Sequence, residues 1–321
     1  MNTSRRPGRP ESRKLSRRDF LRLAAGAAVT AWLPLQPARG RTDARTMTTR
    51  PVPSSGEAIP VVGLGSARTF DVDPSDANAM RPLLGVMRAF HAGGGRLVDS
   101  SPMYGNAEAV IGILARELGV TDDLFMATKV WTRGRDAGIA QMQRSARRMG
   151  VKRLDLIQVH NLVDLRTQLD TLKRWRDEGR VRYIGVTHSS VSTHEDLLRV
   201  VESEPIDFVQ LNYNIAVRDA ERRLLPAAAD RGVATLINEP FGSGSLFRRT
   251  RGRPLPDWAA GIGCGSWAQY FLKFILGHPA VTCVIPATAD PGHEADNVRA
   301  GYGRLPDAAE RARMARHFAS L

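Results

Sequence analysis

Residues 124–160 read LFMATKVWTRGRDAGIAQMQRSARRMGVKRLDLIQVH, and this stretch decides the fold. It begins with a short, mostly apolar run at 124–129 and continues with a helical pattern at 139–149, which ends at Gly150. A second apolar run follows at 154–160. Short apolar runs predict buried strands, and a glycine after the last helical turn is typical of a left-handed C-cap. The stretch therefore predicts a strand–helix–strand unit of a parallel sheet.

The same alternation continues along the chain from residue 60 onward. We predict eight strands, at residues 61–64, 96–99, 124–129, 154–160, 182–186, 207–211, 234–237 and 282–285. Further helical patterns lie at 107–118, 166–178, 193–201 and 220–230, and Gly119, Gly179 and Gly232 follow such patterns. Eight strands, each followed by a helix, over about 260 residues predict a single-domain α/β fold, the (β/α)₈ TIM barrel.

A doubly wound sheet is the main alternative fold. Such a sheet normally has a glycine-rich turn directly after its first strand. Here Gly63-Leu64-Gly65 begins that pattern, but Arg68 occupies the third glycine position. The barrel is therefore favoured, with a small hairpin at residues 47–59 expected to close its bottom.

The positive charge of the chain is concentrated at the N-terminus. The 321 residues include 46 Lys and Arg against 33 Asp and Glu, a net charge of +13. Residues 1–50 hold 12 of the basic and 3 of the acidic residues, so residues 51–321 keep a net charge of +4. A nucleic-acid-binding domain needs its positive excess in the folded part. Nucleic acid is therefore not an expected partner.

The N-terminal residues have the outline of a secretory signal. Residues 16–22, Ser-Arg-Arg-Asp-Phe-Leu-Arg, precede an alanine-rich apolar run at 23–35. That run is shorter than the roughly 20 residues that span a bilayer. The segment resembles a bacterial twin-arginine signal. We therefore expect a signal peptide at 1–40, use of the twin-arginine export machinery, a periplasmic mature protein and no stable membrane span in it.

The remaining boundaries follow from this interpretation. Residues 41–54 are expected to form a linker or a short N-terminal hairpin, and residues 55–321 the barrel. Cys264 and Cys283 allow at most one disulfide bond, and their pairing stays open. The seven histidines show no HxH or HExxH spacing and the cysteines no CxxC motif, so no metal site is expected.

Three consecutive predicted strands end in an ionisable residue. Asp99, Lys129 and His160 occupy these ends, and Tyr104 lies five residues beyond Asp99. In a barrel, the carboxyl ends of the strands form the rim that carries the active site. The topology therefore brings these four side chains to one rim.

These four residue types suit the protonation step of carbonyl reduction. A tyrosine with an ordinary pKa near 10 is a weak acid at neutral pH, and a neighbouring Lys129 cation is expected to lower that pKa. Asp99 is expected to hold Lys129, and His160 to orient a carbonyl oxygen or share its proton. Because no side chain supplies a hydride, a nicotinamide cofactor is expected.

Residues 99–108 resemble the signature of the aldo-keto reductase family, with the sequence Asp-Ser-Ser-Pro-Met-Tyr-Gly-Asn-Ala-Glu. Thr128-Lys129 and Val159-His160 are similar to later strand ends of that family, and the likeness covers roughly residues 55–300. The resemblance implies a (β/α)₈ barrel that binds NADPH and reduces an aldehyde or ketone, or oxidises the alcohol. It also implies a catalytic tetrad of Asp99, Tyr104, Lys129 and His160, with Tyr104 as the general acid.

The resemblance implies cofactor contacts at the later strand ends. Thr187 or His188 is expected to contact the nicotinamide carboxamide, and Gln210 to hold the same amide. Asn238 stands where the family often has a ring-stacking tyrosine. The implied set is completed by Phe241, Gly242, Ser243, Gly244 and Leu246 along the pyrophosphate and by Thr288, His293 and Asn297 at the adenosine end.

The preference for NADP follows family habit. Many members carry a lysine where Ala287 stands and an arginine where His293 stands, and these cations recognise the 2′-phosphate. NADP is therefore the expected cofactor, with NAD as the open alternative.

Two loop features and two functions remain open. Trp131 is expected to line the substrate pocket or to cover the rim. The basic cluster at 248–253 predicts a solvated loop rather than a phosphate clamp. The chain is either an NAD(P)H-dependent oxidoreductase acting on a small-molecule carbonyl substrate or a weakly catalytic cofactor-binding sensor on the same barrel. The four tetrad residue types together favour the enzyme.

Overall fold

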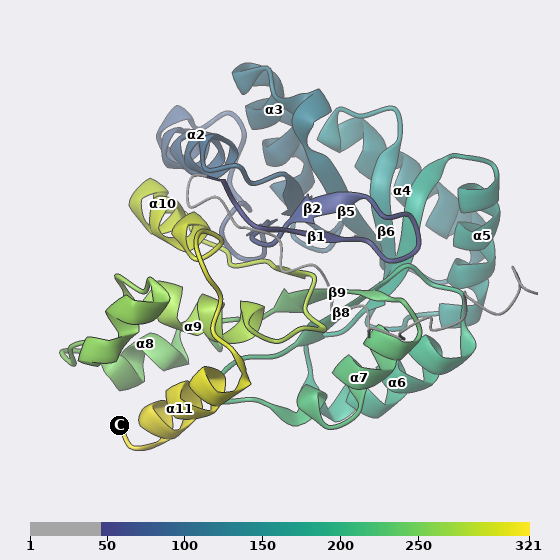
Figure 1. The fold of residues 1–321 in the computed structure, drawn as a ribbon. Coiled ribbons are helices and arrows are strands. Elements are labelled where there is room, and N and C mark those ends of the chain that lie inside the picture. Colours follow the sequence, from purple (N-terminus) through teal and green to yellow (C-terminus); the bar gives the residue numbers. More distant parts are fainter. Residues whose placement is uncertain (1–45) are drawn as a thin grey trace, which may run out of the picture. The chain divides into compact units, whose positions relative to one another are not determined.

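The computed structural model describes residues 46–321 (Figure 1). The expected signal peptide at 1–40, and the segment from 41 to 45, lie outside the described residues. Eight parallel strands form one sheet in the order β10-β9-β8-β7-β6-β5-β4-β3. They are β3 Leu64–Gly65, β4 Leu97–Asp99, β5 Phe125–Val130, β6 Leu154–His160, β7 Val181–Thr187, β8 Phe208–Asn212, β9 Ala234–Asn238 and β10 Cys283–Val284.

The sheet is curled, so that its two edges meet. Val62, just before β3, forms an isolated parallel bridge with Val284 of β10, and the Gly63 amide donates to the Val284 carbonyl at 2.8 Å. The strands neighbour one another in chain order, without the reversal that a doubly wound sheet requires, so that alternative is wrong. The curled parallel sheet fits the expected (β/α)₈ barrel.

Helices follow the strands and pack around the sheet (Figure 1). They are α2 Ala77–Ala92, α3 Ala107–Leu118, α4 Arg135–Met149, α5 Leu165–Asp177, α6 His194–Ser203, α7 Leu224–Asp230, α8 Ser245–Thr250, α9 Trp267–Leu276, α10 Pro291–Arg299 and α11 Ala308–Ala319. Gly119 and Gly150 cap α3 and α4 with φ of 68° and 73°, which confirms the predicted left-handed C-caps. Helix α7 begins later than predicted because Asp219–Glu221 forms a separate 3₁₀ turn.

A two-stranded hairpin covers the amino ends of the strands. It consists of β1 Thr49–Pro51 and β2 Ala58–Pro60, which pair antiparallel. Its Val52 and Ile59 join the apolar cluster inside the sheet, which includes Leu97, Phe125, Ala127, Leu156, Tyr183, Phe208, Ala234, Leu236, Cys283 and Ile285. Arg50 fastens the hairpin by donating to the carbonyl oxygens of Leu276, His278 and Val281. The carboxyl ends of the strands are left for a binding site.

Close approach of β7 to β8 depends on a glycine. Gly185 lies opposite Phe208, and a Cβ at Gly185 would stand 2.4 Å from the Phe208 carbonyl oxygen. We expect Gly185→Ala to lower the free energy of unfolding by about 1–3 kcal/mol, because two backbones must separate to admit the methyl group. Chemical denaturation measures this. Gly261→Ala, where no atom lies within 4 Å, is the control; equal losses in the two variants would contradict the tight β7–β8 contact.

Candidate active site

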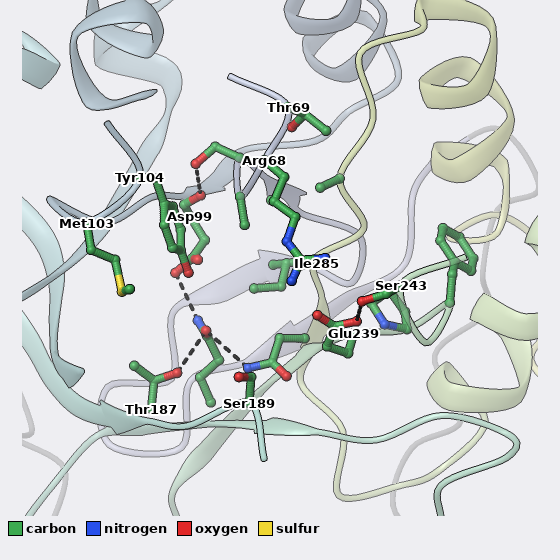
Figure 2. A pocket seen from close by; sticks show the side chains of 18 of the residues that line it. Arg68, Thr69, Asp99, Met103, Tyr104, Thr187, Ser189, Glu239, Ser243 and Ile285 are labelled. Atoms are coloured by element: carbon green, nitrogen blue, oxygen red, sulfur yellow. Dashed lines mark hydrogen bonds between the residues drawn. The ribbon is translucent and has the colours of Figure 1, made fainter. Parts of the chain in front are cut away.

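A cavity of about 710 Å³ opens at the carboxyl ends of the strands (Figure 2). Loops after β3, β4, β6, β7 and β9 contribute to its walls. Tetrad and cofactor candidates from the sequence meet there, since the lining includes Asp99, Tyr104, His160, Thr187, Gln210 and Asn238. A volume of this size lies within the range of small-molecule sites in proteins.

Lys129 and Asp99 form a buried ion pair beneath the cavity. The Lys129 ammonium is fully buried and donates to Asp99 Oδ2 at 2.6 Å and to the Ser100 carbonyl at 2.7 Å. Burial alone would lower the pKa of Lys129, but Asp99 and Tyr104 outweigh it, so the pKa of the ammonium is raised. Lys129 is therefore a permanent cation at neutral pH.

The second oxygen of Asp99 is also satisfied. Oδ1 accepts hydrogen bonds from Gln158 Nε2 at 3.2 Å and from Gln210 Nε2 at 2.9 Å. The carbonyl oxygen of Gln210 in turn accepts from Thr187 Oγ1 at 2.9 Å. The family resemblance implies that Gln210 holds a cofactor amide, but in the structure its own amide is committed to this network. Strands β5, β6 and β8 thus each supply one partner to the same carboxylate.

Tyr104 lies half-buried above this pair. The Lys129 ammonium is 5.0 Å from the centre of the Tyr104 ring. Burial raises the pKa of the Tyr104 hydroxyl; Lys129 opposes the shift and Asp99 adds to it, so the net direction is upward. Lys129 acts to lower this pKa, as expected, but burial and the Asp99 charge outweigh the ammonium. Tyr104 therefore carries its proton at neutral pH.

His160 lines the cavity next to Tyr104 and is a neutral imidazole. Its ring meets the Tyr104 ring edge-to-face, with centroids 5.9 Å apart. Burial, and then the charge of Lys129, lowers the pKa of His160 to about 3. Ser101 Oγ lies 2.9 Å from His160 Nδ1 and itself accepts from the Met103 amide. This arrangement favours donation of a hydrogen bond from the Ser101 hydroxyl to Nδ1, which places the single imidazole proton of His160 on Nε2.

Sequence comparison identifies the family to which this chain belongs. A sequence model of the Aldo/keto reductase family matches residues 61–312. The chain belongs to the aldo/keto reductase family. An aldo-keto reductase of Mycobacterium sp. (strain KMS) is 32% identical over 200 residues, which cover 60% of this chain and 68% of that protein. One of Mycolicibacterium smegmatis is 31% identical over 207 residues, covering 63% and 71%.

Solved aldo-keto reductases share the fold. The enzyme from Klebsiella pneumoniae in complex with NADPH superposes with a TM-score of 0.70 at 24% identity, covering 85% of this chain and 96% of that one. The thermostable aldo-keto reductase Tm1743, in complex with the inhibitor epalrestat, gives a TM-score of 0.68 at 26% identity, covering 84% and 99%.

Several residues implied by the family resemblance lie along the cavity of this aldo/keto reductase. Thr187 and Asn238 end β7 and β9, and Phe241, Ser243 and Gly244 follow β9. The buried Oδ1 atom of Asn238 has no hydrogen-bond partner. An amide oxygen without a partner at a strand end is available to a ligand's donor.

Other implied cofactor residues do not line this cavity. The Nδ1 atom of His188 accepts from the Ser190 amide, which turns the ring into its own loop. The backbone N–H of Gly242 donates a hydrogen bond to the Glu239 carbonyl oxygen and so holds Gly242 in a turn, and Leu246 is buried in the core. Neither Gly242 nor Leu246 lines the cavity.

The adenosine-end candidates also lie outside the cavity lining. Thr288 Oγ1 accepts from the Asp290 amide, and Asp290 accepts from the amide of His293, so both candidates belong to the capped start of α10. Asn297 is buried and donates to Glu294. Trp131 is 41% exposed and does not line the cavity, and its amide and carbonyl groups are hydrogen-bonded to the Gln141 side chain.

The structure adds lining residues that sequence reasoning missed. Arg68, Glu239, Ser189, Met103 and Phe247 all line the cavity. Met103 and Phe247 are exposed apolar side chains, at 40% and 38%. Only Arg68 carried a signal, since it interrupts the glycine pattern after the first strand. The others lie in loops, where no periodicity predicts the direction of a side chain.

Within residues 46–321, two other features bear on the chemistry. Cys264 and Cys283 are free and buried, so the pairing left open by the sequence is not formed. No group of three or more His, Cys, Asp or Glu residues in this range is arranged to hold a metal ion. Within the same range, no helix is long and apolar enough for a membrane span.

Removing Asp99 tests the buried pair. Asp99→Asn leaves the Lys129 cation buried without its counter-ion, so we expect a loss of about 3–5 kcal/mol in unfolding free energy at pH 7. The unpaired lysine then has a lowered pKa, the unfolded state binds more protons, and the variant gains stability as the pH rises toward 10.5, the ordinary lysine value. The wild type keeps its pair throughout this range because its Lys129 pKa is raised.

Chemical denaturation at pH 7 and at pH 10 measures the difference in unfolding free energy between the wild type and Asp99→Asn, which should be smaller at pH 10. Asp99→Asn combined with Lys129→Met removes both charges and should recover much of the loss. A deficit that is the same at both pH values would show that Lys129 is not the cause.

Proposed function

We propose that this aldo/keto reductase uses a reduced nicotinamide cofactor to reduce an aldehyde or ketone, or runs the same reaction to oxidise the alcohol. One observation carries the proposal. A protonated Tyr104 and a neutral His160 line the cavity, and the permanently charged Lys129 lies buried beside the Tyr104 ring. These are the groups that a carbonyl oxygen needs as it gains charge and then a proton.

The residues along the cavity fit a nicotinamide dinucleotide. Asn238 offers an unpartnered buried oxygen, and Gly244 lacks a Cβ, which leaves its backbone open to close approach by a ligand. Thr187, Asn238, Ser243 and Gly244 would hold the cofactor. NADP is proposed because the Klebsiella pneumoniae relative is in complex with NADPH, with NAD as the alternative. When bound, the reduced cofactor supplies the hydride.

The tetrad residues divide the remaining work. His160 Nε2–H donates a hydrogen bond to the substrate carbonyl oxygen and orients it. Tyr104 Oη then delivers its proton to the same oxygen. The phenolate that remains lies beside the Lys129 ammonium, which stabilises the negative charge at short range in a poorly solvated place. Asp99 keeps Lys129 in position and charged.

Tyr104→Phe tests the acid. We expect kcat to fall by at least about 100-fold, because the proton donor is lost, while the Kd for NADPH changes by less than about twofold. Steady-state kinetics with a panel of aldehydes and ketones, together with NADPH fluorescence titration, measure both quantities. Tyr302→Phe, which loses only a bond to the Gly93 carbonyl, is the matched control. Unchanged turnover in Tyr104→Phe would refute the assignment.

The same experiment separates the enzyme from the sensor. A wild-type protein that binds NADPH tightly but turns over no carbonyl compound would support the weakly catalytic sensor in place of the reductase.

We also propose that the protein is exported by the twin-arginine pathway to the periplasm. The support is the Ser-Arg-Arg-Asp-Phe-Leu sequence at 16–21 and the short apolar run after it. This export type agrees with a protein that carries a bound cofactor.

Replacing the arginine pair tests the export signal. With Arg17→Lys and Arg18→Lys together, we expect the protein to stay in the cytoplasm of a bacterial host, because the charge is kept while the recognised pair is lost. Cell fractionation and immunoblotting measure the distribution. Arg13→Lys is the control, and export of the double variant at the wild-type level would contradict the proposal.

A further inference from the structure

Two loops at the carboxyl ends of the strands are joined to each other. The Tyr104 loop, residues 100–106, connects β4 to α3, and the β3–α2 loop consists of residues 66–76. At the start of the Tyr104 loop, Ser66 Oγ donates to the Asp99 carbonyl oxygen at 2.9 Å, and this bond is buried. The β3–α2 loop therefore holds the strand end from which the Tyr104 loop leaves.

Asp71 of the β3–α2 loop holds the other end of the Tyr104 loop. The backbone N–H of Asn106 donates to Asp71 Oδ1 at 2.9 Å. Gly105 lies beside the same carboxylate, because a Cβ built on it would stand 2.1 Å from Asp71 Oδ1. Gly105 also has a φ of 57°, which favours glycine. The carboxylate thus fills the space of a side chain at 105 and contacts the two residues that follow Tyr104.

The backbone that carries Asp71 is itself well anchored. Phe70, the residue before it, is fully buried in the main apolar cluster of the protein. The Phe70 amide donates to the Ser66 carbonyl at 3.2 Å, and the Val72 amide donates to the Phe70 carbonyl at 3.0 Å. The Tyr104 side chain packs against the same apolar cluster. A carboxylate on such a fixed backbone can hold a neighbouring loop in place.

The negative charge of Asp71 suits the start of a helix. Asn106 is the N-cap residue of α3, and its own side chain makes no capping hydrogen bond. The N–H groups at a helix start carry partial positive charge, and they bond more strongly to a carboxylate than to a neutral acceptor. Asp71 therefore stabilises the junction between the Tyr104 loop and α3 from a neighbouring loop.

We infer that Asp71 is a positioning residue for the acid Tyr104; this rests on the proposed function. Asp71 bonds to the backbone two residues after Tyr104, so it acts on the reaction through the place of the phenol. The tyrosine hydroxyl must lie within hydrogen-bond reach of the carbonyl oxygen, and a displacement of about 1 Å can lower a rate by about 100-fold. Without Asp71, the Tyr104 loop loses one of its two anchors.

Asp71→Ala tests this role in the purified full chain. We expect kcat to fall by about 10-fold, while KM for the carbonyl substrate and the Kd for NADPH each change by less than about twofold, because only the acid is displaced. Asp71→Asn keeps an oxygen that accepts from the Asn106 amide and should recover most of the rate. In the Tyr104→Phe background, Asp71→Ala should not lower kcat further, because no acid is left to position. Steady-state kinetics with NADPH and the compound of the carbonyl panel that the wild type reduces fastest, together with NADPH fluorescence titration, measure these quantities.

Asp73→Ala is the matched control, since Asp73 lies in the same loop and its side chain bonds only to Ser75 among the described residues. Thermal melting shows that each variant is folded. Unchanged kcat in Asp71→Ala, or an equal fold-loss with and without the Tyr104 hydroxyl, overturns the inference and leaves the proposed function intact. Because Asp71 also lines the cavity, a raised KM at unchanged kcat assigns it to substrate binding and overturns the inference as well. A wild-type protein that reduces no carbonyl compound overturns the proposed function and this inference together.

Discussion

The site depends on one buried ion pair, Asp99 with Lys129, whose charged atoms are 2.6 Å apart and whose side chains are almost entirely removed from solvent. Removing two charges from water costs several kcal/mol for each ion, and attraction offsets this cost only when the remaining donors and acceptors are also satisfied. Gln158, Gln210 and the Ser100 carbonyl complete the pair. These partners come from β6, β8 and the end of β4, so the charge pair fixes how the strand ends stand relative to one another.

The same cation sets the protonation of its neighbours. Lys129 opposes the upward pKa shift of Tyr104 and contributes to the lowered pKa of His160, near 3. The result is a site at neutral pH with one proton donor, one neutral imidazole and one fixed positive charge. In the proposed reaction, the developing oxyanion meets hydrogen-bond donors because the imidazole is uncharged, and the Lys129 charge stabilises the phenolate.

Sequence reasoning predicted the strands, most of the helices and the proximity of the four tetrad residues, because hydrophobic periodicity and barrel topology determine them. Asp99 and His160 end β4 and β6, and Lys129 is the next-to-last residue of β5 between them, so the three residues share one rim whatever their side chains are. It did not predict the upward shift of the Tyr104 pKa, because that shift depends on burial, which no sequence pattern shows. It also missed Arg68 and Glu239, whose left-handed backbone is imposed by the fold. His188 and Leu246 do not line the cavity, and loop contacts, which sequence patterns do not show, decide where their side chains lie.

The two ends of the sheet divide stability and function between them. At the amino ends, Glu57 of the hairpin bonds Arg182 and Tyr183, and Arg182 also bonds Asp155. These bonds tie the hairpin to β6 and β7 and close that end with a satisfied polar network. At the carboxyl ends, by contrast, the loops after β3, β6 and β9 hold the left-handed non-glycine residues of the described chain. Such residues lower stability, and a rim of this kind holds its shape only because the buried charge pair and the covered opposite end keep the strands in place.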